Sequence, residues 1–114
     1  MVAPIILSFR YGMEQHVVHA PTTLGRETHA HFRQEALEVL EASHPADRWT
    51  QLVVDLSATR EVDSAGLGAL VLVQRRAAEM RRAVFLRGVS EELRVLLVMT
   101  RLDDRFVFEE SAAV

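Results

Sequence analysis

The pattern of apolar and polar positions divides this chain into alternating strands and helices. A continuous apolar run at 52–56, LVVDL, predicts a central strand that is covered on both faces. Apolar residues recur at helical spacing from about Glu27 to Ser43, and again from Ser64 to about Arg81 or Arg82, which predicts two helices. Further strands are expected at 4–9, 15–20, 83–86 and 105–109.

A third helix is predicted to follow a serine and two glutamates. Ser90 is a residue type that favours the N-cap position, and Glu91 and Glu92 suit the positive end of the helix dipole. The apolar stripe of this helix consists of Leu93, Leu96 and Leu97. The order β-β-α-β-α-β-α-β then predicts a single α/β domain, residues 1–114, with a four- to five-stranded mixed sheet and helices mainly on one face.

Composition narrows the class of protein. The 114 residues suffice for one hydrophobic core, and a net charge of −3 without a long basic run argues against a nucleic-acid-binding surface. The absence of cysteine excludes disulfides and fits a cytoplasmic protein. The apolar N-terminus lacks the basic region of a signal peptide, and the longest strongly apolar run, 67–73, is too short to span a bilayer. We therefore expect a soluble protein without direct membrane insertion.

The start of the second helix is the most informative part of the chain. It lies in the segment 63–68, DSAGLG, with Ser64 as the expected N-cap because a serine hydroxyl can accept a bond from an unpaired amide of the first turn. A helix N-terminus also favours an added anion such as phosphate. Ser64 can therefore be a cap, a phosphorylation switch, or both.

One face of this helix combines small, apolar and basic residues. At 100° per residue, Ser64, Gly68 and Leu72 step along one line, with Arg75 beside them. Leu72 falls within the polar arc and is expected to be exposed, either in a docking stripe or as one of the single exposed leucines that are common on protein surfaces. The polar arc otherwise contains Arg75, Arg76 and Glu79, and the arc expected to face the core contains Leu70, Val71, Val73, Ala77 and Ala78.

Motifs of nucleotide sites and phosphotransfer enzymes are incomplete in this chain. The glycines at 66 and 68 lack the third small residue of a dinucleotide-binding turn, since Val71 stands there. Asp55 would need a metal-binding acidic pair near the first strand to accept a phosphoryl group, and only Glu14 is available. Asp55 and Asp63 are therefore expected to bond local backbone amides.

The histidines and Ser64 do not form a metal site or a hydrolase site. His16 and His19 would point to opposite faces of a strand, and His29 and His31 would diverge on a helix. Ser64 lacks the Gly-x-Ser-x-Gly elbow of hydrolases. We therefore expect no catalytic residue, no metal and no cofactor, and a protein that is not an enzyme.

The segment 63–68, preceded by the strand that ends in Asp55-Leu56, resembles the corresponding segment of STAS domains, and more specifically of bacterial anti-sigma factor antagonists. The resemblance extends over about 52–108 and includes FLRGVS at 85–90 and the late Leu102-Asp103. It implies a STAS-like single domain. In that family the serine after the aspartate is phosphorylated by a partner kinase of the GHKL ATPase type, which is also the anti-sigma factor.

By this resemblance Ser64 is the phosphorylation site, flanked by Asp63 and Gly66, and the candidate partner-binding residues are Gly68, Leu72 and Arg75. The unphosphorylated antagonist binds the kinase and frees sigma, and phosphorylation abolishes that binding. Phosphate would add about −1.5 to −2 charge at a helix N-terminus, so the fold is expected to survive while the interface is disrupted.

Two departures from the family pattern leave an alternative open. The segment after the second strand, at 22–25 with Arg26 following, lacks the acids usual in the family, and Arg101 replaces a glycine before the late Leu-Asp. The alternative is a non-switching structural STAS subunit of a lipid-transport ATPase complex or of a stress-signalling scaffold, with Ser64 serving mainly as a cap. The identity of the partners and the oligomeric state stay open as well.

Overall fold

A four-stranded parallel sheet forms the centre of the molecule. The structure, a computed structural model, describes residues 15–42 and 51–109, and the strand expected at 4–9 lies outside these ranges. The strand order is β1-β3-β5-β6, and each neighbouring pair is parallel. The strands are β1 (Gln15–His19), β3 (Gln51–Asp55), β5 (Val84–Arg87) and β6 (Val107–Phe108).

The predicted α/β class is confirmed, with strand bounds within two residues of those expected from the sequence. Only parallel pairs join the described strands of this sheet, so the antiparallel member of a mixed sheet is not among them. The central strand is fully covered: Leu52, Val53 and Val54 are all buried. This explains why its sequence is a continuous apolar run rather than an alternating one.

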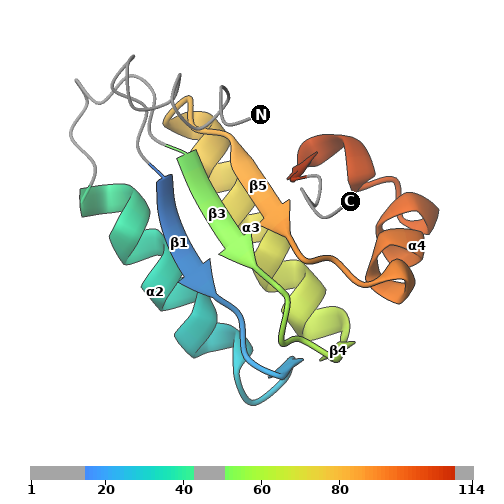
Figure 1. Cartoon of the computed structure of the whole chain (residues 1–114). Helices are drawn as coiled ribbons and strands as arrows, with labels where there is room; N and C mark the ends of the chain where they lie inside the picture. The colour runs from blue at the N-terminus through green and yellow to red at the C-terminus, as the bar shows by residue number, and fades with distance from the viewer. Residues whose placement is uncertain (1–14, 43–50, 110–114) are drawn as a thin grey trace, which may run out of the picture.

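Two helices cover one face of the sheet. Figure 1 shows α2 (His29–Ala42) and α3 (Ser64–Glu79) side by side behind β1, β3 and β5. The third helix, α4 (Glu91–Met99), lies beyond β5 at the side of the sheet, and is followed by a single 3-10 turn, η1 (Asp103–Arg105). None of the described helices is long and apolar enough to cross a membrane.

A second, two-stranded sheet was not predicted from the sequence. It pairs β2 (Thr23–Leu24) with β4 (Glu61–Val62) in parallel. Strands of two residues carry no periodic signal, so the hydrophobic pattern could not show them. Their pairing places the loop after β1 against the N-terminus of α3, where Asp63 N donates a hydrogen bond to Leu24 O.

The core lies between the sheet and the two covering helices. Leu70 is 1% exposed and packs in the core as predicted, whereas Leu72 is 41% exposed, also as predicted. Ala78 was expected in the core-facing arc but is exposed, and Val71 is only half-buried. The buried face of α3 is narrower than the core-facing arc expected from the sequence, because a single stripe of residues fills the space between the sheet and α2. The buried residues of α3 are Gly66, Ala69, Leu70, Val73 and Ala77.

Helices α3 and α4 end in the same way. The residues after their C-caps, Arg81 and Arg101, have φ values of 60° and 59°. Arg82 N then donates to Ala77 O, which closes α3 two to three residues earlier than expected. Arg101 therefore occupies a left-handed position that favours glycine, which is the residue that the resemblance noted above leads one to expect there.

We expect Leu70→Ala to lower the free energy of unfolding by about 2–5 kcal/mol, because it removes a fully buried side chain and leaves a cavity. Leu72→Ala, the matched control on the exposed side of the same helix, should stay within about 0.5 kcal/mol of the wild type. Chemical denaturation of both variants measures the difference. A loss below about 1 kcal/mol for Leu70→Ala would show that the helical phase is wrong.

Candidate functional site

Asp63, not Ser64, is the N-cap of α3. Asp63 has the extended backbone of a cap residue, and its Oδ1 accepts a hydrogen bond from Gly66 N at 3.0 Å. The chain is already helical at Ser64, so the sequence-based assignment of the cap to Ser64 was wrong by one residue. Aspartate and serine are comparable N-caps, and the two stand next to each other in the sequence. Backbone geometry decides between them.

The second carboxylate oxygen of Asp63 binds a different part of the chain. Oδ2 accepts a hydrogen bond from Arg26 N at 3.0 Å, in the loop after β2. The backbone N–H groups of Gly66 and Arg26 lower the pKa of Asp63 below its ordinary value, so the carboxylate is ionised at neutral pH. Asp63 therefore joins the β2 loop to the N-terminus of α3, and the expected local bonding of this residue is confirmed.

The glycines around Asp63 are required for close packing. A Cβ atom on Gly66 would overlap the carbonyl oxygen of Leu24, and one on Gly25 would overlap the carboxylate of Asp63. Gly66 is thus a packing residue that lets α3 begin directly against the β2 loop. This contact accounts for the first glycine of the DSAGLG segment without any nucleotide.

Ser64 is left free by this arrangement. It is exposed, it is the first residue of α3, and its hydroxyl makes no hydrogen bond to any residue that the structure describes. The alternative role of Ser64 as the cap is therefore overturned, because Asp63 performs it. The hydroxyl is accessible at the positive end of a sixteen-residue helix.

The loop after β2 lies against the N-terminus of α3. Residues 22–26 approach α3 through the bond from Arg26 N to Asp63, and the Arg26 side chain is exposed. The charged side chains that the sequence places at this contact are Asp63 and Arg26. The loop therefore contributes a cation, Arg26, close to the N-terminus of α3.

The predicted stripe of Gly68, Leu72 and Arg75 borders an open groove of about 430 Å³ between α2 and α3. A Cβ atom on Gly68 would meet nothing within 4 Å, so no packing within the described chain requires a glycine there. Arg75 forms no ion pair with a described residue, whereas Arg76 pairs with Glu79 at 3.0 Å. The remaining residues that line the groove are Leu37, Val71, Arg76 and Glu79.

A second open groove, of about 440 Å³, begins at Asp63 and leads to α4. Its walls are the loop 59–63 on one side and Ser90, Leu93 and Leu96 on the other. Ser90 caps α4 as predicted, since its Oγ accepts from Leu93 N at 3.1 Å. No sequence pattern indicates this groove, because its two walls are far apart along the chain.

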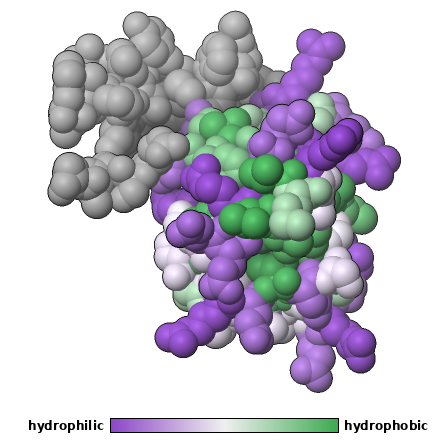
Figure 2. All heavy atoms as spheres, turned by 90° about the vertical axis from the view of Figure 1, so that its right-hand side faces the viewer, coloured by the Kyte–Doolittle hydropathy of each residue, from purple (hydrophilic) through white to green (hydrophobic). Residues whose placement is uncertain are grey.

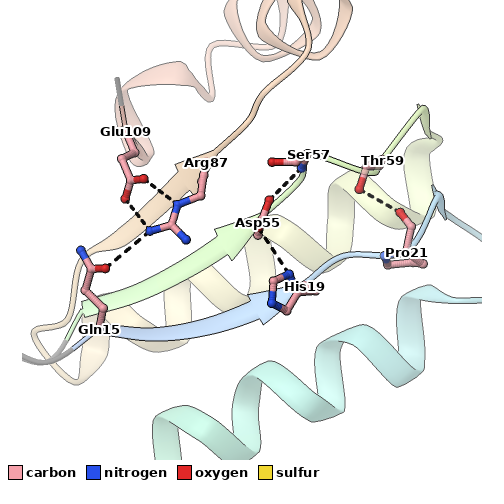
Figure 3. Close-up of polar contacts among 8 residues, drawn as sticks. All are labelled: Gln15, His19, Pro21, Asp55, Ser57, Thr59, Arg87 and Glu109. Atoms are coloured by element: carbon pink, nitrogen blue, oxygen red, sulfur yellow. Dashed lines mark hydrogen bonds and ion pairs between the residues drawn. The ribbon is translucent and has the colours of Figure 1, made fainter. Parts of the chain in front are cut away.

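A row of ionisable residues crosses the other face of the sheet. The register places His19 beside Asp55 and Asp55 beside Arg87, at the carboxyl ends of three strands (Figure 3). His19 Nδ1 lies 3.4 Å from Asp55 Oδ2, and Arg87 Nε donates to Glu109 Oε1 at 2.6 Å. A hydrogen bond from the Ser57 side chain is the main cause that lowers the pKa of Asp55.

The members of this row bind one another: Asp55 contacts His19 and Ser57, and Arg87 pairs with Glu109. Ser57 N also donates to Asp55 Oδ1 at 2.9 Å, which confirms the expected local role of Asp55. Among the described residues, no three His, Asp or Glu side chains gather closely enough to hold a metal ion. The row was not predicted, because only the strand register brings these positions together.

The glycines at 66 and 68 should respond oppositely to alanine. Gly66→Ala should destabilise the protein, because its Cβ overlaps Leu24 O. Gly68→Ala should stabilise it by up to about 1 kcal/mol, because alanine is the better helix former and the space is open. Thermal and chemical unfolding measure both. If Gly66→Ala is also stabilising, the close contact with the β2 loop is not present in solution.

The cap assignment is tested by three variants. Asp63→Ala should lower the melting temperature more than Ser64→Ala does, because it removes the acceptor for both Gly66 N and Arg26 N. The melting temperature of Asp63→Ser should lie between those of the two alanine variants, since a serine can cap the helix but cannot also reach Arg26. If Ser64→Ala proves the most destabilising of the three, Ser64 is the cap after all.

Solved structures show the same fold. The chain aligns with a candidate anti-sigma factor antagonist of Thermotoga maritima at a TM-score of 0.67 and 22% identity, covering 85% of this chain and 81% of that one. An anti-sigma-factor antagonist (STAS) domain protein of Planctomyces limnophilus aligns at 0.70 and 18%, covering 83% and 81%. A sulfate transporter family protein of Wolinella succinogenes aligns at 0.59 and 19%, covering 85% and 76%.

Sequence comparison assigns the family. No curated protein matches the chain closely enough to be counted as a relative. Residues 8–109, nearly the whole chain, match the family described as "Mlab, STAS domain". This range contains Asp63, the free Ser64 and the packing glycine at 66. The chain belongs to the STAS domain family.

Proposed function

We propose that this chain is an anti-sigma factor antagonist that works by partner switching in the cytoplasm. Unphosphorylated, it binds an anti-sigma factor that is also a kinase of the GHKL ATPase type, and phosphorylation of Ser64 releases it. The observation that carries the proposal is the free hydroxyl of Ser64 beside a cap supplied by Asp63. A serine that does not hold the helix can be modified without cost to the fold.

The electrostatics of the site favour a switch that acts on the interface. A phosphate adds about −1.5 to −2 charge, which the N-terminal end of α3 tolerates. Asp63 is already ionised next to it. A docked partner would have to desolvate both anions, so its affinity for this chain should fall. The hydrogen bonds that Gly66 N and Arg26 N donate to Asp63 should persist.

The surface beside Ser64 offers a place for the partner to bind. Gly68 leaves the backbone of α3 open one turn from Ser64, which permits close approach of another chain. Leu72 provides an exposed apolar anchor, and Arg75 a cation that forms no ion pair with a described residue. Arg26 adds a second cation at the β2 loop, so the matching partner surface should carry acidic groups opposite these arginines.

A non-switching subunit of a lipid-transport ATPase complex is the second candidate function. It is favoured by the family description "Mlab, STAS domain" and by a fold neighbour from a sulfate transporter family protein. Such a subunit would use the same exposed face of α3 to bind its partner. It would not be modified at Ser64. Phosphorylation therefore separates the two functions.

The switch is tested by affinity capture from the native host and by binding measurements with the captured partner. Ser64→Asp should bind the anti-sigma kinase at least about tenfold more weakly than wild type, because it places a charge at the interface. Ser64→Ala should bind as wild type does and should not accept phosphate. Gln34→Glu on the exposed side of α2 is the control for added charge, and should bind normally.

Leu72→Ala should weaken the same binding without changing the melting temperature, as expected of an exposed anchor. Mass measurement of the protein from the host should show one added phosphate on Ser64. If Ser64→Asp and wild type bind the captured partner equally and no phosphate is found, partner switching is wrong. A transporter ATPase as the partner would then support the structural subunit.

A further inference from the structure

Helix α4 (Glu91–Met99) carries apolar residues on its exposed side as well as on its buried side. The segment 93–99, LRVLLVM, contains a single polar residue, Arg94. Leu93 and Leu97 pack into the core, whereas Val95, Val98 and Met99 are 49%, 53% and 76% exposed. Exposed apolar residues that lie together on a surface are typical of a binding site. Among residues 15–42 and 51–109, no element buries these three side chains.

The exposed apolar residues of α4 form one stripe. Val95, Val98 and Met99 are spaced at i, i+3 and i+4, so they lie on the same side of the helix. Glu91 extends this stripe by one turn toward the N-terminus, and Arg101 follows directly after the C-cap Thr100. Figure 2, which views the molecule from the side on which α4 lies, shows apolar side chains gathered in the middle of this face with hydrophilic ones around them.

We propose that the outer stripe of α4, formed by Val95, Val98 and Met99, binds the same stripe of a second copy of this chain, with the two helices antiparallel. The charges at its two ends favour this occupant. A two-fold axis near the middle of the stripe brings Glu91 of one copy to Arg101 of the other, and the reverse contact follows by symmetry. The antiparallel arrangement also pairs opposite ends of the two helix dipoles.

A lipid surface fits this stripe less well. The segment 91–105 carries four acids and three arginines, so it has no excess of the basic residues that anionic membranes attract. The contact is also independent of the proposed switch, because the stripe contains neither Ser64 nor a residue of the Gly68 groove. The area of one short helix face corresponds to a weak dimer rather than a permanent one.

Sedimentation velocity over a concentration series tests the proposal. Wild type should show a reversible monomer–dimer equilibrium. Val98→Glu combined with Met99→Glu should raise the dimer dissociation constant by more than about thirtyfold, which corresponds to about 2 kcal/mol. Ala78→Glu, at an exposed position on α3 outside the proposed partner-binding residues, is the matched control and should leave the equilibrium unchanged.

Exchanging the charges of Glu91 and Arg101 distinguishes a direct contact between the two copies from a general effect of the substitutions on folding. Glu91→Arg and Arg101→Glu should each weaken the dimer, because each places like charges opposite one another, and the two together should restore it. Loss of helix stability cannot produce that rescue. A wild type that stays monomeric to millimolar concentration, a dimer insensitive to the Val98 and Met99 changes, or binding of the stripe to anionic vesicles would overturn the proposal.

Discussion

The carboxylate of Asp63 is the interaction on which the arrangement of this site depends. Its two oxygens accept from Gly66 N in α3 and from Arg26 N in the β2 loop, and its own N–H donates to Leu24 O. One residue thus satisfies a donor of the first helical turn and attaches a loop that is 37 positions away in the sequence. A serine at this position could form the first bond only.

The division of roles between Asp63 and Ser64 has a functional consequence. If the serine were the cap, phosphorylation would alter the bond that starts the helix, and modification and stability would be coupled. With the cap on Asp63, the hydroxyl next to it can change its charge while the helix start remains fixed. The packing of Gly66 against Leu24 adds to this rigidity. Under the proposed function, the site would be a switch of surface charge on a constant scaffold.

Much of this fold could be predicted from the periodicity of the sequence. The buried strand at 52–54, the helix around Leu70 and the cap at Ser90 follow from patterns that packing and capping impose locally. What could not be predicted depends on distant partners. The strands β2 and β4 are too short for a pattern, and Ser64 and Asp63 are equally good caps until the backbone geometry is known. The row from His19 to Arg87 exists only through strand register.

The candidate site could be proposed from the sequence because it is concentrated in six consecutive residues, 63–68. The cap of α3 was assigned to the wrong one of them. Gly66 and Gly68 illustrate the difference: the sequence treats them alike, but one is packed against Leu24 and the other faces open space. A glycine in a helix is unfavourable unless something requires it. For Gly66 the requirement lies within the chain. For Gly68 no described residue supplies such a requirement, which is compatible with the close approach of a partner that we propose for this face of α3.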